Sequence, residues 1–263
     1  MKLHRTITGM IHIDPLPGTP KYGGNFTSIL KKAKEEAAMY RDAGVDMIAI
    51  ENMHDVPYLK QYVGPEIISA MSVTGYEVKN TSRLPCGIQI LAGANKEALS
   101  SALAGGLDFV RVEGFVFSHI ADEGFIDGCA GELLRYRKQI GAEHIKIFTD
   151  IKKKHSSHAI TSDVNIGETA HAAEFFLSDG VIVTGSTTGS PADLEELRQV
   201  KESVKIPVLV GSGVTYENIQ SYLDIADGLI VGSYFKYDGH WSKGVDFKKV
   251  KRFMDKVNKI RNG

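Results

Sequence analysis

The chain has 263 residues, of which 43% are hydrophobic and 24% charged, and its formal net charge is −1. This composition is typical of a folded globular protein and gives no electrostatic reason to expect a nucleic acid or an anionic membrane as partner. Two cysteines are too few for a disulfide framework and fit a reducing compartment. No apolar run approaches the roughly 20 residues of a membrane span, and the N-terminus lacks the apolar core of a signal peptide. We therefore expect a cytoplasmic protein without an integral membrane segment.

Eight short apolar runs, separated by longer amphipathic segments, predict eight β-strands. The runs are Ile7–Ile13, Val45–Ile50, Gly87–Leu91, Phe109–Val112, Ile145–Phe148, Val181–Val183, Val208–Val210 and Leu229–Val231. Between the first two, Ile29, Ala33, Ala37 and Tyr40 recur at helical spacing. Strands that alternate with helices form parallel sheets covered by helices, and eight such units fit the usual size of one barrel. We therefore predict an α/β fold, a single (β/α)8 TIM barrel that forms one domain over residues 1–263.

The seventh and eighth predicted strands each run into a turn of small residues, Gly211–Gly213 and Gly232–Ser233. Glycine lets backbone N–H groups approach an anion closely, and a following helix adds the partial positive charge of its N-terminus. The loops after strands 7 and 8 of such barrels commonly bind phosphate. The predicted phosphate-binding residues are Ser186, Gly211, Ser212, Gly213, Gly232 and Ser233. The alternative is two ordinary turns with glycine in the left-handed conformation.

Polar residues follow the fifth predicted strand at the end where barrel enzymes carry their catalytic groups. If the extended alternation continues, Asp150, Lys152 and Lys154 share one face with Phe148. The intervening positions are mainly apolar, and an apolar face should meet the helices. We therefore expect Asp150 and the two lysines to point toward the barrel mouth.

Similar reasoning at the other strand ends completes a set of ionisable and polar candidates. The predicted catalytic residues are Glu51, Asp150, Lys152, Lys154, His12, Asn52 and Arg111. Glu51 and Asp150 suit general acid or base roles, and a lysine here would stabilise developing negative charge or form a Schiff base with a carbonyl group. On the fourth strand Arg111 shares a face with Glu113, so an ion pair between these two is the structural alternative.

The sequence does not predict a binuclear metal site. The first strand offers His12 and Asp14 where such a site needs two histidines, and the sixth and eighth strands end in Thr184-Gly185 and Gly232-Ser233. A single divalent cation held by Glu51 and Asp150 together with a phosphate stays open, because oxygen ligands suit magnesium.

Three predicted loops are longer than the usual two to six residues of a strand-to-helix turn. The segment up to Asn25 follows the first strand, residues 114–129 follow the fourth, and the segment up to Gly167 follows the fifth. Long loops on one rim of a barrel are commonly lids or binding loops. We expect these loops to lie on the rim that carries the site.

Several longer motifs carry a family resemblance from about residue 5 to residue 236. They are Gly9-Met10-Ile11-His12 with Pro15-Leu16-Pro17-Gly18, Glu51-Asn52 with Asp55 and Pro57, Asp122-Glu123-Gly124, Glu132–Arg137, Lys146-Ile147-Phe148 with Asp150, Thr184-Gly185 with Thr188-Gly189, and Val210–Thr215 with Glu217-Asn218. The sequence resembles the BtpA family, which includes the bacterial SgcQ-type proteins. The resemblance implies a barrel of the ribulose-phosphate-binding kind. Cyanobacterial members of the family it resembles are linked to the stability of photosystem I, and SgcQ-type members are encoded among sugar-uptake genes.

Three functional hypotheses follow. The leading one is an enzyme that acts on a small phosphorylated metabolite, a sugar phosphate or a nucleotide-like compound, by isomerisation, lyase cleavage or glycosidic hydrolysis. The second is a non-catalytic assembly or stability factor that retains a phosphate site. The third is an FMN-dependent oxidoreductase, which would use the same phosphate site. A homo-oligomer is compatible with all three.

Overall fold

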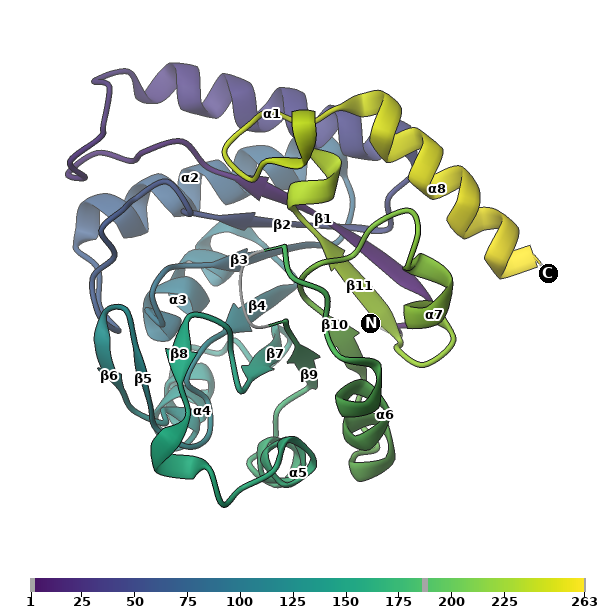
Figure 1. Ribbon diagram of the computed structural model, residues 1–263. Helices are drawn as coiled ribbons and strands as arrows, with labels where there is room; N and C mark the ends of the chain where they lie inside the picture. Colours follow the sequence, from purple (N-terminus) through teal and green to yellow (C-terminus); the bar gives the residue numbers. More distant parts are fainter. Residues whose placement is uncertain (1–2, 186–188, 263) are drawn as a thin grey trace.

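The computed structural model describes residues 3–185 and 189–262. Eight parallel strands close into a barrel, because β1 pairs with β2 on one side and with β11 on the other (Figure 1). The barrel strands are β1 (Thr6–His12), β2 (Met47–Glu51), β3 (Cys86–Gln89), β4 (Phe109–Val112), β7 (Lys146–Ile151), β9 (Gly180–Val183), β10 (Val208–Val210) and β11 (Gly228–Val231). The predicted (β/α)8 barrel is confirmed, and its fifth to eighth predicted strands are β7, β9, β10 and β11.

Helices connect the barrel strands and cover the outside of the barrel (Figure 1). They are α1 (Phe26–Ala43), α2 (Pro65–Ser82), α3 (Asn95–Gly105), α4 (Ala130–Gln139), α5 (Ile166–Phe175), α6 (Leu194–Ser203), α7 (Ile219–Leu223) and α8 (Phe247–Asn262). The first begins after Asn25, whose side chain accepts a hydrogen bond from the backbone of Ser28, and it ends at Gly44 in the left-handed conformation. The predicted stripe that contains Ala37 and Tyr40 is fully buried.

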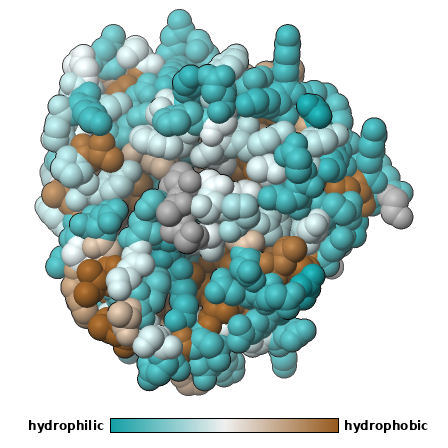
Figure 2. All heavy atoms as spheres, viewed as in Figure 1, coloured by the Kyte–Doolittle hydropathy of each residue, from teal (hydrophilic) through white to brown (hydrophobic). Residues whose placement is uncertain are grey.

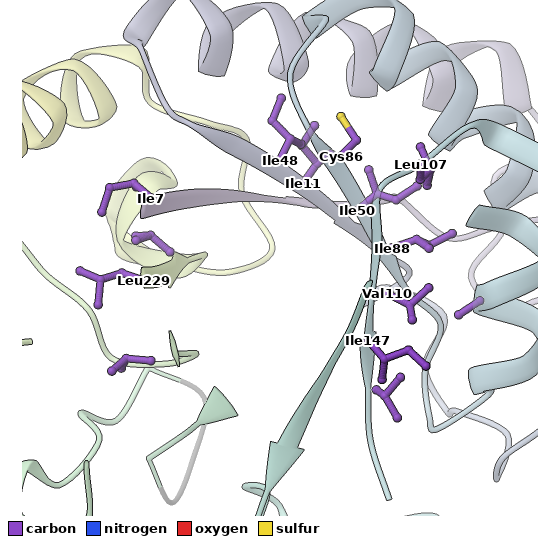
Figure 3. Packing of buried hydrophobic residues seen from close by; sticks show 14 of the residues in the cluster. Ile7, Ile11, Ile48, Ile50, Cys86, Ile88, Leu107, Val110, Ile147 and Leu229 are labelled. Carbon is purple, nitrogen blue, oxygen red and sulfur yellow. The ribbon is translucent and has the colours of Figure 1, made fainter. Parts of the chain in front are cut away.

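Alternation along the strands divides the core into two layers. Ile48 and Ile50 point outward into the main cluster between strands and helices, which Figure 3 shows from close by. Met47 and Ala49 point inward, into a smaller cluster that fills the barrel. This arrangement follows from the two-residue period of a strand, since both faces of a barrel strand are buried.

Two aromatic rings fill much of the barrel interior. Phe109 and Phe148 lie with ring centroids 5.5 Å apart. Neighbouring glycines leave room for them: a Cβ at Gly87 would lie 2.2 Å from the Phe109 ring, and one at Gly180 would lie 2.7 Å from the Phe148 ring. The interior is therefore packed below the mouth, and the open space lies above this aromatic layer.

The long loops after β4 and β7 meet at one rim of the barrel. A hairpin of β5 (His119–Ala121) and β6 (Gly124–Ile126) follows β4, and β8 (Ser156–Ser157) follows β7. These segments form a three-stranded antiparallel sheet in the order β6-β5-β8 (Figure 1). The expectation that these two loops lie on one rim, at the strand ends, is confirmed.

Two further expectations concern the cysteines and the membrane. Cys86 and Cys129 are free thiols. Of the helices in residues 3–185 and 189–262, none is long and apolar enough to cross a membrane.

The substitution Gly87→Ala tests the packed interior. We expect it to destabilise the protein by about 1–3 kcal/mol, because the added methyl group overpacks the Phe109 ring. Gly23→Ala is the matched control, since a Cβ there meets no atom within 4 Å. It should change the free energy of unfolding by less than about 0.5 kcal/mol. Urea denaturation measures both, and equal effects would contradict the packing described.

Candidate active site

A cavity of about 250 Å³ opens at the C-terminal ends of the barrel strands. Its walls bring together the loop after β10, the loop after β11 and the ends of β1, β2 and β4. The lining residues with polar groups or turn glycines include His12, Glu51, Arg111, Lys154, Gly211, Ser212, Gly213, Thr215, Gly232 and Ser233. Most of the predicted phosphate-binding and catalytic residues thus line one cavity, and their roles stay predictions.

The loop after β10 is held tightly against the loop after β9. The Ser212 hydroxyl accepts a hydrogen bond from the Gly185 backbone at 2.6 Å and donates one to the Ser190 carbonyl at 3.1 Å. Gly213 has a φ of +64°, and a Cβ there would lie 2.3 Å from Ser190. Glycine is therefore required at this position both for its conformation and for the close approach. The predicted ligand Ser186 lies outside the described residues.

Backbone donors in these loops differ in their availability. The backbone N–H of Gly211 donates a hydrogen bond to the Val183 carbonyl at 2.8 Å. In the part of the chain that the structure describes, the N–H groups of Gly213 and Val214 have no hydrogen-bond acceptor. The support from a helix N-terminus stays a prediction: α7 begins only at Ile219, whereas a three-residue 3-10 helix begins directly after β11 at Ser233. Any anion here would rely on loop N–H groups and neighbouring cations.

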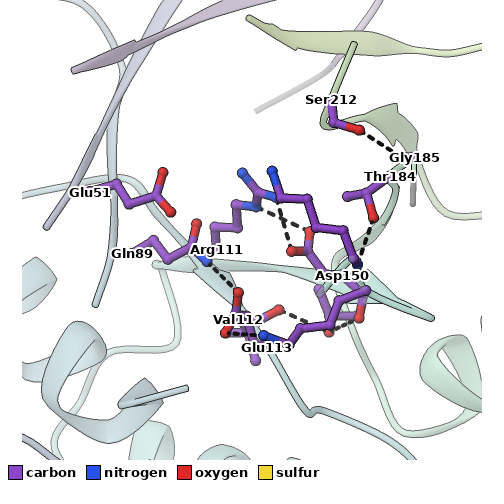
Figure 4. A network of polar contacts seen from close by, with 12 residues as sticks. Glu51, Gln89, Arg111, Val112, Glu113, Asp150, Thr184, Gly185 and Ser212 are labelled. Atoms are coloured by element: carbon purple, nitrogen blue, oxygen red, sulfur yellow. Dashed lines mark hydrogen bonds and ion pairs between the residues drawn. The ribbon is translucent and has the colours of Figure 1, made fainter. Parts of the chain in front are cut away.

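Arg111 and Asp150 form a buried bidentate ion pair in the barrel mouth. Arg111 Nη2 and Nε donate to the two carboxylate oxygens of Asp150 at 2.9 and 3.1 Å (Figure 4). The alternative considered above, an ion pair of Arg111 with Glu113, is not the arrangement found. Glu113 instead accepts from Lys153 Nζ at 3.2 Å and from Gln89 Nε2 at 3.1 Å. β4 and β7 are neighbours in the barrel, which brings Asp150 within reach of Arg111.

Asp150 points into the barrel mouth as predicted from the alternation along the fifth strand, but the alternation stops after Ile151. Lys152 has a φ of +42°, which breaks the alternation of an extended strand. Its amine donates to the Thr161 carbonyl at 3.2 Å and does not line the barrel-mouth cavity. The expected convergence of Lys152 with Glu51 is therefore wrong. Lys153, which the alternation assigned to the outer face, is buried in the site instead.

Glu51 projects into the cavity from the end of β2 and lies close to His12 at the end of β1. Glu51 Oε2 lies 3.9 Å from His12 Nε2. The other ring nitrogen, Nδ1, lies 2.7 Å from the Trp241 carbonyl, which only accepts, so Nδ1 carries a proton. Burial and nearby Lys236 hold the pKa of His12 well below its usual value. The ring is therefore neutral, and its Nε2 lone pair faces the cavity side.

The pKa of Glu51 is raised. Burial is the largest cause, while Arg111 and Lys154 oppose it. The pKa of Lys154 is lowered, again mainly by burial and then by the charge of Arg111. Within the described ranges the Lys154 amine has no hydrogen-bond partner. Both shifts bring the groups closer to neutral pH, where an acid or base transfers protons most effectively.

Asn52 has a structural task. Its amide oxygen accepts from the Leu91 backbone at 2.8 Å, and its amide nitrogen donates to Asp55 at 2.9 Å. Asp55 in turn accepts from the Leu16 backbone at 2.9 Å. Asn52 therefore ties together the loops after β1, β2 and β3, and its polar groups are already occupied.

The residues present do not fit a divalent cation held by Glu51 and Asp150. Both carboxylate oxygens of Asp150 accept hydrogen bonds from Arg111, and a cation there would lie against the guanidinium charge. Among the residues that the structure describes, no group of three or more histidine, cysteine, aspartate or glutamate side chains could hold a metal ion.

A second lobe of about 240 Å³ adjoins the cavity and shares Glu51, Met53 and Lys154 with it. It adds three carboxylates and an amine, together with two aromatic side chains. These residues are Glu113, Asp122, Glu123, Lys153, Tyr58 and Trp241. The sequence motifs pointed to several of these positions but did not assign them roles. Trp241 lies in the loop before α8 and reaches the site only through the fold.

Solved structures resemble this barrel throughout its length. A thiamine phosphate pyrophosphorylase from Pyrococcus furiosus superposes with a TM-score of 0.61 at 16% identity, covering 97% of this chain and 96% of its own. A geranylgeranylglyceryl phosphate synthase from Thermoplasma acidophilum, solved with sn-glycerol-1-phosphate, gives 0.59 at 17% identity, with 97% and 94% covered. The class of protein is thus a TIM barrel whose structural neighbours include enzymes of phosphorylated substrates.

Sequence comparison then identifies the family. The model of the BtpA family matches residues 3–259, and the chain belongs to this family. An uncharacterised protein of Caenorhabditis elegans, described as mitochondrial, is 51% identical over 260 residues, covering 97% of this chain and 94% of its own. The photosystem I biogenesis protein BtpA of Synechocystis is 35% identical over 253 residues, with 96% and 88% covered. Because one relative is described as mitochondrial, a cytoplasmic location stays a prediction.

The buried ion pair provides a stability prediction. Asp150→Asn should cost about 3–5 kcal/mol, because it leaves the Arg111 charge buried without a partner. Asp14→Asn is the matched control: Asp14 pairs with Lys32 at 2.6 Å, but both side chains are about one-third exposed. A pair of this kind contributes about 0–1 kcal/mol. Equal losses of unfolding free energy in urea would contradict a dominant role of the inner pair.

A second prediction concerns Glu51→Gln. The raised pKa of Glu51 means that the folded protein binds this proton more tightly than the unfolded chain does. Stability from this group is therefore complete below the unfolded pKa and falls as the pH rises through the folded pKa. The glutamine variant lacks this loss, so its stability relative to the wild type should increase as the pH rises from about 4, the usual pKa of an unfolded glutamate, to neutral. Thermal and urea denaturation across this range measure it; a constant loss of about 3–5 kcal/mol would instead identify Glu51 as an ion-pair partner.

Proposed function

We propose that this protein is an enzyme that acts on a small phosphorylated metabolite by acid and base catalysis at the C-terminal rim of the barrel. One observation carries the proposal: the glycine loops after β10 and β11 line the same cavity as Glu51 and Lys154. Phosphate bound by the loops would bring the rest of a small molecule within reach of these two side chains.

The phosphate end of the cavity has the properties that an anion needs. The free N–H groups of Gly213 and Val214 can donate to phosphate oxygens, and the missing Cβ at position 213 lets the ligand approach the backbone. The cations Arg111 and Lys154 line the same space. Two structural neighbours are a thiamine phosphate pyrophosphorylase and a synthase solved with sn-glycerol-1-phosphate, which supports a phosphorylated ligand for this chain as well.

The acid and base groups line the same cavity as the glycine loops. Glu51 with its raised pKa would donate a proton, and the free Nε2 of neutral His12 would accept one. Lys154, with a lowered pKa, would act as a base or form a Schiff base with a carbonyl carbon. These groups serve isomerisation, lyase cleavage and glycosidic hydrolysis, and the proposal leaves the choice among them open.

The second lobe would hold the part of the substrate that carries no phosphate. Its carboxylates accept hydrogen bonds, and its aromatic side chains offer flat apolar surfaces. A sugar or nucleoside-like group presents hydroxyl donors and a flat face, which suits such a lining. Two lobes of about 250 and 240 Å³ suit a small metabolite.

Two other functions are compatible with a phosphate-binding barrel. The name of the Synechocystis relative describes biogenesis of photosystem I, which corresponds to an assembly factor. A scaffold, however, gains nothing from buried ionisable groups with shifted pKa values, such as Glu51 and Lys154, that face a cavity. A flavin-dependent oxidoreductase would be yellow when purified, so the visible absorbance spectrum distinguishes it.

Anion binding is the first test of the proposal. A crystal grown in sulfate or phosphate should contain an anion hydrogen-bonded to the backbone of Gly213 and Ser233 or their immediate neighbours. These loops supply the donors, and the nearby cations supply the charge. Ordered loops with only water at a saturating anion concentration would contradict the phosphate site.

Two lysine variants test the catalytic assignment. Lys154→Met should lower turnover of a phosphorylated substrate by about 100-fold or more, because it removes a group that takes part in proton transfer or covalent chemistry. Lys152→Met is the matched control, since its amine bonds to Thr161 outside the cavity. Steady-state kinetics of both variants, with circular dichroism to check folding, distinguish the two roles. Equal effects on turnover would contradict the assignment.

A further inference from the structure

Gln89, at the end of β3, has an amide group whose orientation is fixed by its surroundings. Its Nε2 donates to Glu113 Oε1 at 3.1 Å, while Lys153 donates to the other oxygen of Glu113 at 3.2 Å (Figure 4). A reversed amide would place its oxygen against a carboxylate oxygen, and neither atom has a proton to share. The donor side of the amide must therefore face Glu113.

The opposite side of the same amide lacks a partner. Gln89 is 2% exposed, and its Oε1 is a buried oxygen without a hydrogen-bond donor among the residues that the structure describes. Buried polar atoms are almost always hydrogen-bonded, because leaving one unpaired loses its interaction with water and gains nothing in return. An unpaired oxygen beside a reactive site indicates that a neighbouring group donates a hydrogen bond to it in a different protonation state.

Glu51 is the group next to this oxygen. Glu51 and Gln89 are register partners on β2 and β3, and their side chains have the same length. Figure 4 shows both reaching into the barrel mouth side by side, with the Gln89 oxygen directed toward the carboxyl group. As a carboxylate, Glu51 only accepts hydrogen bonds, so the two oxygens would repel each other. As a carboxylic acid, Glu51 supplies the missing donor.

We propose that Gln89 is a positioning residue that retains a proton on Glu51 by accepting a hydrogen bond from its carboxylic acid group. A directed chain then crosses the barrel mouth: Lys153 and Gln89 both donate to Glu113, and Glu51 donates to Gln89. Glu113 thus acts at a distance, because it fixes the amide that selects the acid form of Glu51.

The charged groups around Glu51 are consistent with this assignment. They come from every neighbouring element: His12 from β1, Tyr58 after β2, Arg111 and Glu113 from β4, Asp150 from β7 and Lys154 from the loop after β7. Arg111 and Lys154 favour the carboxylate, but Arg111 is bound to Asp150 on both oxygens. Burial, Glu113 and Asp150 favour the acid, and the pKa of Glu51 is raised overall.

The catalytic consequence rests on the proposed function. A protonated Glu51 is ready to act as the general acid: its proton passes to a substrate atom, and the carboxylate left behind faces the amide oxygen of Gln89. That repulsion drives Glu51 to regain a proton at the end of the cycle. The protonation state itself exists in the free protein, so it can be measured without a substrate.

Infrared difference spectroscopy of the free protein tests the inference. The carboxylic acid C=O band that is present in the wild type and missing in Glu51→Gln reports the protonated residue, and its intensity is followed against pH. In Gln89→Met, which keeps the length of the side chain but removes the acceptor, the proton affinity should fall about tenfold, a downward shift of about one pH unit. Gln199→Met is the control, since Gln199 lies on the exposed side of α6 and contacts Asn165.

Each result has a definite meaning. An unchanged midpoint in folded Gln89→Met would overturn the role of Gln89. If that variant fails to fold, the wild-type spectrum still decides: a Glu51 acid band that persists to neutral pH supports the inference, and its absence at pH values above about 5 overturns it. A confirmed acid band in a protein that converts no phosphorylated compound would reject only the proposed function.

Discussion

The buried pair of Arg111 and Asp150 determines the electrostatics of the whole barrel mouth. Asp150 occupies two donors of the guanidinium group, so the other carboxylates must find different environments. Glu113 forms an ion pair with Lys153, and Glu51 has no comparably close cationic partner among the described residues. Three carboxylates in one small space thus have different surroundings, and burial raises the pKa of Glu51. Different surroundings are the usual way for a protein to obtain an acid and a base from the same residue type.

This division of charge explains why the two lobes of the site differ. The lobe beside the glycine loops combines free backbone donors with cations, whereas the lobe beside Tyr58 and Trp241 is rich in carboxylates. Glu51 and Lys154 line both lobes and therefore lie where a ligand spanning them would react. The rim sheet of β5, β6 and β8 supplies Asp122 and Glu123 to the second lobe, so the long loops complete the site.

The barrel could be predicted from the sequence because its strands are buried on both faces and read as apolar runs. Val208–Val210 coincides with β10, and the remaining runs fall within a few residues of their strands. The direction of Asp150 also followed from alternation. What alternation could not supply is the positive φ of Lys152, which directs Lys152 away from the cavity and brings Lys153 into the site. Such a turn depends on the loop that follows, through the bond from Lys152 to Thr161.

The hydrogen-bond and ion-pair partners of the site residues could not be predicted from the sequence either. Arg111 and Glu113 lie two residues apart on one strand, yet each bonds to a residue of the loop or strand that follows. Gln89 received no role, because an unpaired amide oxygen is visible only when all neighbouring donors are placed. Strand positions follow from local patterns, whereas hydrogen-bond partners across a barrel depend on register and loop closure.

The most direct measurement of the central claim is conversion of phosphorylated metabolites by the purified protein, followed by mass spectrometry of the products. Each compound is paired with its dephosphorylated counterpart, and the wild type is compared with Glu51→Gln. The account predicts that at least one phosphorylated compound is converted, that its counterpart is not, and that the variant loses this activity. Equal conversion of the phosphorylated and dephosphorylated compounds, or equal conversion by the wild type and Glu51→Gln, would contradict the account.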